Sequence, residues 1–277
     1  MPNKKVNLGL INFTNCLPIN YSLNKWNYEG LTLFAGCPTE LNIMMKNKII
    51  DIAPVSSIEY INNQDKYTLM DNICISSFGK VDSVILFSNY EIEKLSGKNI
   101  AVPHTSATSI ALLKILLSEK GIDTDSINFS THSYGSSLEE FLKNRYDAVL
   151  YIGDPALCAN IKFNNNFFKY DLGECWFEMT NLPMVFATWV ARSEWITNNN
   201  YNYLLTKSIL DKAVESGLNI YFNEIIKSAS ENLKIDKFFV EDYLKNKIKY
   251  NFTKYHMESL KLFKEKNDSL IKMAEVL

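Results

Sequence analysis

The stretch VNLGLINFTNCLP, residues 6–18, predicts how the chain begins to fold. Val6–Ile11 is largely apolar, although Asn7 interrupts it, and its length suits a single strand. Pro18 is acceptable in the first turn of a helix but not inside a central strand. The Asn-rich segment Asn12–Asn15 lies between the two and favours a turn. The stretch therefore predicts a strand, a turn and a short helix in succession, which is the unit of an α/β sheet.

The same order of strand, loop and helix recurs along the chain. Helices are predicted over residues 41–49, 108–120 and 138–144, with Gly121 placed to end the second of them. Further strands are predicted at Leu31–Ala35, Asp51–Val55, Asn99–Val102, Ile127–Thr131, Asp147–Ile152 and Val185–Ala191. This alternation predicts an α/β fold with parallel sheets.

Two β-rich segments, near residues 86 and 188, separate two α/β blocks, and nearly all of the chain after Ala191 has a helical pattern. We expect a two-lobed α/β fold with a helical C-terminal region. The first lobe would comprise residues 1–88 and 189–277, and the second residues 89–188. Two crossovers between the lobes would form a hinge, and a cleft between lobes is a common place for a ligand.

The composition excludes several classes of protein. The chain has 277 residues, of which 47% are hydrophobic and 22% charged, so it can form a sizeable core. Its net charge of −2 gives no basic footprint for nucleic acid. No window approaches the roughly 18 apolar residues of a membrane span, and the apolar run Val6–Ile11 is shorter than the core of an export signal. We expect a soluble cytoplasmic protein that binds neither nucleic acid nor membrane.

Metal and cofactor motifs are absent from the sequence. The five cysteines are odd in number and form no C-x-x-C pair, and the three histidines lack metal-ligand spacing. Neither G-x-G-x-x-G nor G-x-x-x-x-G-K-[ST] occurs. We therefore expect free thiols, no metal, and neither dinucleotide nor P-loop nucleotide binding.

The best predicted anion site is Ser106-Ala107-Thr108-Ser109, which follows a strand and begins a helix. The positive end of the helix dipole, the first backbone N–H groups and the hydroxyls of Ser106, Thr108 and Ser109 would all face a ligand. The alternative is that Ser106 is an ordinary helix N-cap.

Other polar residues also follow strands, where ligands collect in open α/β sheets. Asn15 follows the first strand, although it could instead serve only the turn. Ser56 and Ser57 follow the third strand, and Ser83 begins the β-rich segment near residue 86. Asp154 follows the strand at 147–152, and it could equally be the N-cap of a helix whose first residue is Pro155.

Together these segments resemble the chorismate dehydratase family of the futalosine route to menaquinone, over residues 6 to 192 with a weaker helical match beyond. The resemblance is carried by NCLP (15–18), DIAPVSSIEY (51–60), GKVDSVILFS (79–88), SATS (106–109), IGDPAL (152–157), YDLG (170–173) with Trp176, and LPMVFA (182–187).

The resemblance implies a type II periplasmic-binding-protein fold, chorismate as the substrate, 3-[(1-carboxyvinyl)oxy]benzoate as the product and no cofactor. It also suggests substrate-assisted elimination in which Asn15 holds the ring, while Asp154 is the alternative base or acid. Members of the family often have Arg where this chain has Ala107, so an arginine contact does not carry over.

Two other functions fit the same fold. The sister enzyme that makes 1,4-dihydroxy-6-naphthoate typically has His-Glu where this chain has Gly153-Asp154, and a Pro-Leu-Gly-like sequence in place of Val185–Ala187. A solute-binding protein of a transporter would bind its ligand without catalysis, because fold alone does not fix function. The absence of an export signal argues against it. The sequence does not indicate an oligomeric state.

Overall fold

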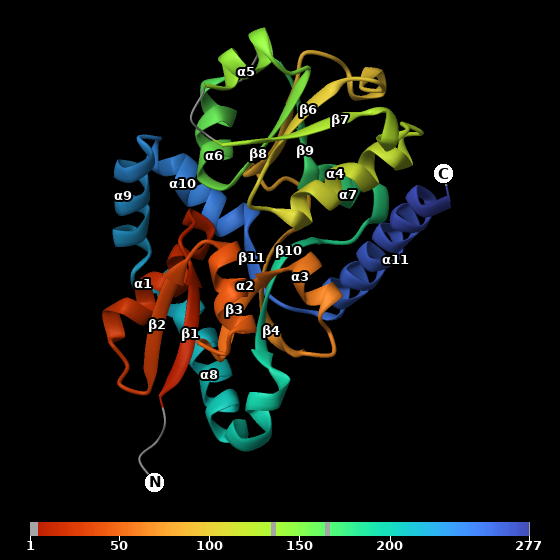
Figure 1. Ribbon diagram of the computed structural model, residues 1–277. Helices are drawn as coiled ribbons and strands as arrows, with labels where there is room; N and C mark the ends of the chain where they lie inside the picture. Colours follow the sequence, from red (N-terminus) through yellow and green to blue (C-terminus); the bar gives the residue numbers. More distant parts are fainter. Residues whose placement is uncertain (1–4, 134–136, 164–166, 277) are drawn as a thin grey trace. The chain divides into compact units, whose positions relative to one another are not determined.

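The computed structural model describes residues 5–133, 137–163 and 167–276 (Figure 1). The chain forms two compact units, each with its own β-sheet. Unit 1 contains Met1–Ser76 and Val185–Lys254, and unit 2 contains Ser77–Met184 and Tyr255–Leu277. The chain therefore crosses between the units three times: after Ser76, after Met184 and after Lys254.

Unit 1 has a six-stranded sheet in the order β11-β4-β10-β3-β1-β2. β1 is parallel to β2 and β3, whereas β10 is antiparallel to β3 and β11 to β4. The strands are β1 (Val6–Ile11), β2 (Leu31–Gly36), β3 (Ile52–Ser56), β4 (Tyr67–Ser77), β10 (Met184–Arg192) and β11 (Lys249–Asn251). The helices are the 3₁₀ turn η1 (Thr14–Cys16), α1 (Leu17–Trp26), α2 (Pro38–Lys46), α3 (Ser57–Asn62), α8 (Ser193–Asn219), α9 (Phe222–Leu233), α10 (Lys237–Asp242) and the π-helical turn η4 (Tyr243–Lys247).

Helices α1 and α8 of unit 1 approach each other closely. The Ser22 hydroxyl on α1 lies 2.8 Å from the carbonyl oxygen of Ala213 on α8. Gly217 is buried in the same contact, and a Cβ at this position would overlap the Pro18 carbonyl group and lie 2.6 Å from Pro18 Cα. Glycine is therefore required here by the distance between the helices rather than by its backbone freedom.

Unit 2 has a five-stranded sheet in the order β7-β6-β8-β5-β9. β6 is parallel to β7 and β8, whereas β5 is antiparallel to β8 and β9. The strands are β5 (Val84–Ser88), β6 (Asn99–Pro103), β7 (Asn128–His132), β8 (Ala148–Ile152) and β9 (Phe168–Asp171). The helices are η2 (Ile92–Lys94), α4 (Ala107–Glu119), η3 (Thr124–Ser126), α5 (Leu138–Asn144), α6 (Gly153–Lys162), α7 (Leu172–Thr180) and α11 (Lys254–Val276).

The long helix α11 belongs to unit 2 through contacts with α7 and α4. The indole N–H of Trp176, a fully buried residue of α7, donates to the Ser259 hydroxyl at 3.0 Å. The rings of Trp176 and Phe263 meet edge to face, 5.6 Å apart. At the far end of α4, Lys266 lies 2.6 Å from Glu119.

The α/β class and the helical C-terminal region are confirmed, but the structure differs from the predicted lobes. The prediction placed all of residues 189–277 in the first lobe, whereas Tyr255–Leu277 belongs to unit 2, where Ser259 contacts Trp176. The predicted break near residue 88 lies instead after Ser76, because Val84–Ser88 is an interior strand of the second sheet. Each sheet is also mixed rather than parallel, since β10 and β5 run against their neighbours.

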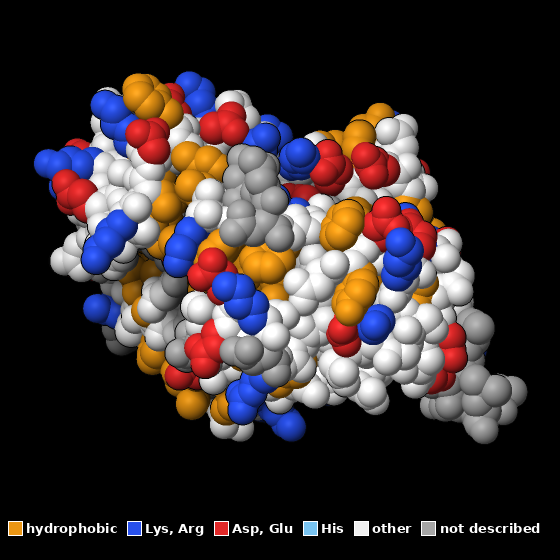
Figure 2. Space-filling model, turned by 90° about the horizontal axis from the view of Figure 1, so that it is seen from above, with side chains coloured by type: hydrophobic (Ala, Val, Ile, Leu, Met, Phe, Trp, Pro, Cys, Tyr) orange, Lys and Arg blue, Asp and Glu red, His pale blue; other side chains and the backbone are white. Residues whose placement is uncertain are grey.

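The surface agrees with the near-neutral net charge. On the face drawn in Figure 2, Lys and Arg side chains alternate with Asp and Glu side chains rather than gathering into a basic stripe. Within the ranges that the structure describes, no helix is both long and apolar enough to cross a membrane.

Substitution of Gly217 by Ala is expected to lower the free energy of unfolding by about 2–3 kcal/mol, because the added methyl group forces α1 and α8 apart. Urea unfolding followed by circular dichroism measures this loss. The exposed neighbour Glu215 is the control, and Glu215→Ala should change stability by no more than about 0.5 kcal/mol. Equal stability of Gly217→Ala and the parent protein would contradict the described helix contact.

Acid is expected to destabilise the fold through His256 on α11. This histidine is 1% exposed beside Phe78, and burial lowers its pKa to about 4 from an ordinary value near 6.5. Between pH 6.5 and pH 4, His256 therefore binds a proton in the unfolded chain but stays neutral in the folded protein. Stability contributed by neutral His256 is present above pH 6.5 and falls by up to about 3 kcal/mol towards pH 4. Urea unfolding between pH 4 and pH 6.5 should give a free energy of unfolding that depends less on pH in His256→Gln than in the parent protein. The same pH dependence in both proteins would contradict this role of His256.

Candidate active site

In unit 1, the carboxyl ends of β1 and β3 lie at the same edge of the sheet because the two strands are parallel. Asn15 follows β1, and Ser56 and Ser57 stand at the end of β3 and the start of α3. β10 begins at this edge, with Ala187 opposite Ser56. The sheet thus brings together the three predicted site residues that belong to unit 1.

Asn15 is held by its backbone and keeps part of its side chain available. Its carbonyl oxygen accepts a hydrogen bond of 3.0 Å from the Tyr250 hydroxyl. Burial raises the pKa of Tyr250 well above its usual value, so this hydroxyl stays a neutral donor. Among the described residues, the buried Oδ1 atom of Asn15 accepts no hydrogen bond. This observation weighs against the alternative in which the Asn15 oxygen only satisfies the turn.

The two serines after β3 perform structural tasks. Ser56 is the N-cap of α3, and its hydroxyl accepts a hydrogen bond from Glu59 N at 3.3 Å. Ser57 is fully buried and donates to the Val185 carbonyl at 2.6 Å, which ties the start of α3 to β10. The Ser57 hydroxyl proton is therefore already used by the fold, and its role at this edge is to fix the start of α3.

In unit 2, five strands contribute to one edge of the sheet. β6, β7, β8 and β9 end there, and β5 begins there because it runs the opposite way. The edge therefore collects Ser83 before β5, residues 106–109 after β6 and Asp154 after β8. All five of the predicted site residues that belong to unit 2 lie along it.

The segment Ser106–Ser109 begins α4, as predicted. Ser106 is the N-cap, and its hydroxyl accepts from Ser109 N at 3.3 Å and donates to Ser109 Oγ at 2.8 Å. The capping alternative is therefore correct for Ser106. Thr108 and Ser109 are 2% and 3% exposed, so their hydroxyls lie under the surface at the positive end of the helix dipole. Capping and anion binding can coexist because a helix start has several N–H groups.

Ser83 and Asp154 are joined through the backbone. The Ser83 carbonyl accepts a hydrogen bond of 2.7 Å from Gly153 N, and Ser83 is 2% exposed. Helix α6 begins at Gly153 after Ile152, so Asp154 lies in the first turn rather than at the N-cap. Burial and the negative charge of Asp154 raise the pKa of Cys158, one turn further along.

Asp171 was not among the predicted site residues, although the segment YDLG (170–173) that contains it was among those that carry the family resemblance. Asp171 ends β9 and lies at the same edge of the sheet as Ser83 and Asp154. Its carboxylate accepts from Gly173 N at 3.0 Å and Glu174 N at 3.1 Å, so it caps α7. The available signal was an Asp directly before a helical segment, which predicts a cap but not its other contacts.

The described residues hold no cluster of three or more His, Cys, Asp or Glu side chains that could bind a metal ion. The five cysteines are free thiols. The donors of the predicted site residues at the two edges are neutral hydroxyls, carboxamides and backbone N–H groups, and Asp154 and Asp171 add carboxylates at the edge of the second sheet.

Solved structures of the periplasmic-binding-protein kind share this fold. The chain is similar to protein AF1704 from Archaeoglobus fulgidus (TM-score 0.74, 16% identity, 97% of this chain and 98% of that one). It is also similar to the aliphatic sulphonate binding protein SsuA from Escherichia coli (TM-score 0.70, 14% identity, 99% and 94%). A third structure, from Candida albicans, is described as having the generic periplasmic binding protein fold (TM-score 0.63, 14% identity, 99% and 90%). The chain therefore has a periplasmic-binding-protein-like α/β fold.

Sequence comparison identifies the family. Residues 6–268 match the profile of a family described as menaquinone biosynthesis. The chain is also 30% identical over 265 residues to the chorismate dehydratase of Thermus thermophilus, which covers 91% of this chain and 89% of that protein. The chain belongs to this menaquinone-biosynthesis family.

Removal of the Tyr250 hydroxyl should weaken the loop that carries Asn15. Tyr250→Phe leaves the Asn15 carbonyl without its described donor, and we expect the free energy of unfolding to fall by about 1–2 kcal/mol. Tyr203→Phe is the matched control, since it removes a hydroxyl that donates to the Leu69 carbonyl of the same unit. Amide exchange near residue 15 should rise only in Tyr250→Phe; similar exchange in both variants would contradict the contact.

Proposed function

We propose that this protein is a chorismate dehydratase, a carbon–oxygen lyase that converts chorismate to 3-[(1-carboxyvinyl)oxy]benzoate and water. The observation that carries the proposal is the 30% identity to a chorismate dehydratase along 91% of the chain, within a family of menaquinone biosynthesis. The proposal includes a cytoplasmic location and a place in the futalosine route.

The reaction can proceed in two steps. The C–H bond at the ether-bearing ring carbon breaks first, and its electron pair is delocalised through the diene onto the ring carboxylate. The C–O bond to the ring hydroxyl then breaks, the electron pair returns to form an aromatic ring, and the leaving hydroxide takes up the proton as water. The protein must orient a dianion and stabilise the enolate-like intermediate.

We propose that polar residues at the sheet edges perform this task. Ser106, Thr108 and Ser109 would donate to a substrate carboxylate at the start of α4, where the helix dipole favours an anion. Ser83, together with Ser56 and the backbone at Ser57, would supply further donors. Support comes from the arrangement within each unit, where the predicted residues share one edge of each sheet. Neutral donors preorganised by the fold can stabilise developing charge without reorganising during the reaction.

Asn15 is proposed to hold the ring while the enolpyruvyl carboxylate of chorismate removes the ring proton itself. The unpartnered Oδ1 atom of Asn15 supports this role, because a carboxamide with a spare acceptor can bind the ring hydroxyl. Orientation of this kind is worth large rate factors when reacting groups are held close together. Asp154 is the alternative base or acid, since it lies at the edge of the second sheet beside Gly153.

A solute-binding protein would bind chorismate and return it unchanged. Incubation of purified protein with chorismate, followed by mass spectrometry, separates the two functions. We expect a product lighter by one water, with the absorbance of a benzoate. Intact chorismate that stays bound through gel filtration would instead identify a binding protein.

Asn15→Ala is expected to lower kcat at least about 100-fold through loss of orientation. Steady-state kinetics by product absorbance measure this effect. Asp154→Asn is the comparison: normal turnover in this variant excludes Asp154 as base or acid, whereas loss of activity confined to Asp154→Asn would replace the substrate-assisted mechanism by one that uses Asp154.

A further inference from the structure

The turn before Ser83 has an unusual backbone. Gly79 has φ +90° and Asp82 has φ +58°, so two of its four residues lie in the left-handed region. Asp tolerates this region better than most residues, but still adopts it rarely. Some other part of the structure must therefore hold the turn Gly79–Asp82 in place.

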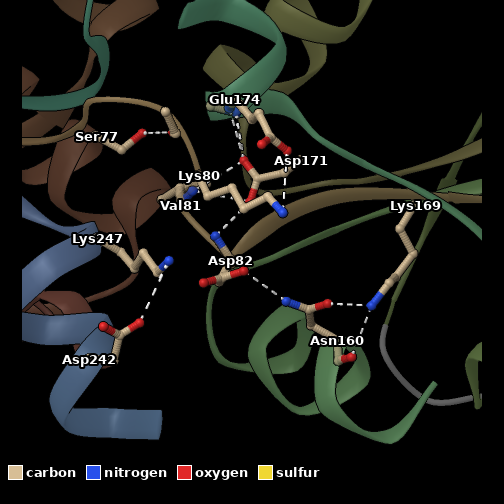
Figure 3. Close-up of polar contacts among 12 residues, drawn as sticks. Ser77, Lys80, Val81, Asp82, Asn160, Lys169, Asp171, Glu174, Asp242 and Lys247 are labelled. Carbon is tan, nitrogen blue, oxygen red and sulfur yellow. Dashed lines mark hydrogen bonds and ion pairs between the residues drawn. The ribbon is translucent and has the colours of Figure 1, made fainter. Parts of the chain in front are cut away.

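Asp171 holds the turn from one side. Its carboxylate accepts from Val81 N at 3.0 Å and from Asp82 N at 2.7 Å, as Figure 3 shows, while it also caps α7. Asp171 is 8% exposed, and burial raises its pKa to about 6, against the lowering effect of these backbone donors. One buried carboxylate thus fixes the turn, the end of β9 and the start of α7 together.

The first turn of α7 also packs against the same segment. A Cβ at Gly173 would lie 2.7 Å from Ser77 Oγ and 2.8 Å from the Gly79 carbonyl oxygen. Because no side chain fits there, the distance between the helix and the turn Gly79–Asp82 is fixed by glycine.

Asn160 holds the turn from the other side (Figure 3). Its side-chain amide donates to Asp82 Oδ1 at 3.0 Å. Lys169 donates to Asn160 Oδ1 at 2.7 Å, which leaves the amide nitrogen directed to Asp82. The side chain of Asp82 is therefore fixed by α6, while its backbone N–H is fixed by Asp171.

The residue that follows this turn is Ser83, whose carbonyl binds Gly153 N next to Asp154. We propose that Asp171 and Asp82 are positioning residues for chorismate turnover, which place Ser83 at the substrate through the turn Gly79–Asp82. The proposal rests on the proposed function. Neither residue need touch the substrate, because both act through the backbone of the turn.

The first test is Asp171→Asn, which replaces one acceptor oxygen by an NH₂ group that faces amide donors. We expect Asp171→Asn, introduced into the parent protein, to lower kcat/KM at least tenfold. In a Ser83→Ala background, Asp171→Asn should lower kcat/KM less than threefold, since the Ser83 hydroxyl that Asp171 positions is already absent. Ser137→Ala is the matched control, because it removes the cap of α5 in the same unit without touching the turn, and it should leave kcat/KM unchanged.

The second test separates position from charge at residue 82. Asp82→Asn keeps an acceptor for Asn160 and tolerates the left-handed backbone, so it should retain at least half of the kcat/KM of the parent. Asp82→Ala loses both features, and its kcat/KM should be at least tenfold lower than that of the parent protein. Loss in both variants would show that the charge matters and would overturn the positioning role.

The outcomes distinguish this inference from the function on which it rests. Parent protein that leaves chorismate intact refutes the proposed function, and the role in turnover with it. Parent turnover with independent losses from Asp171→Asn and Ser83→Ala refutes the positioning role alone. Amide exchange gives a readout that does not depend on activity: the N–H groups of Val81 and Asp82 should exchange at least tenfold faster in Asp171→Asn, and unchanged exchange overturns the proposal.

Discussion

The second unit depends on a buried negative charge that is stabilised by backbone amides. Asp171 accepts hydrogen bonds from Val81, Asp82, Gly173 and Glu174, which come from a turn and a helix start far apart in the sequence. Burial favours the neutral acid, whereas each N–H donor favours the carboxylate. The balance leaves the group ionised near neutral pH, with four amides oriented around it. The strand end, the helix and the turn therefore share one anchor.

The two sheets use the same principle to gather polar side chains. Parallel strands end at one edge, and the chain turns there before it enters a helix. Some of the side chains at these edges serve the fold: Ser57 donates to Val185, and Ser56 and Ser106 cap helices. Asn15 differs, because its buried carboxamide oxygen accepts no hydrogen bond among the described residues. The fold thus separates polar groups that build the edge from those with capacity for a ligand.

Local patterns predicted the individual elements well. The bounds of the strand at residues 6–11 and of the helix at 138–144 agree with the structure, and Gly121 has the expected left-handed backbone at φ +75°. Three strands were missed. β9 and β11 have only four and three residues, which carry too little periodicity, whereas the longer β4 (Tyr67–Ser77) has an apolar pattern that Asp71 and Asn72 interrupt. The packing of α11 on Trp176 was also missed, because an apolar helix face does not indicate which sheet it covers.

The same limit applies to the candidate site. Strand ends followed by Ser, Asn or Asp are visible in the sequence, so the edge residues could be predicted. Asp171 was visible only as a helix cap, because its contact with Asp82 joins residues 89 positions apart. The substrate roles of Asn15, Asp154 and the serines stay predictions that kinetics must decide.

The order of the segments along the chain also constrains synthesis. Unit 1 is completed late, because residues 185–254 supply β10 and α8, and Trp176 of unit 2 lacks Ser259 and Phe263 until α11 is made. When the first 184 residues have been made, unit 1 therefore still lacks part of its sheet, whereas the apolar cluster of unit 2 between Ile85 and Phe163 is already complete in sequence. Nascent chains with exposed apolar surface are prone to aggregate. During synthesis the first unit is therefore exposed to aggregation for longer than the second.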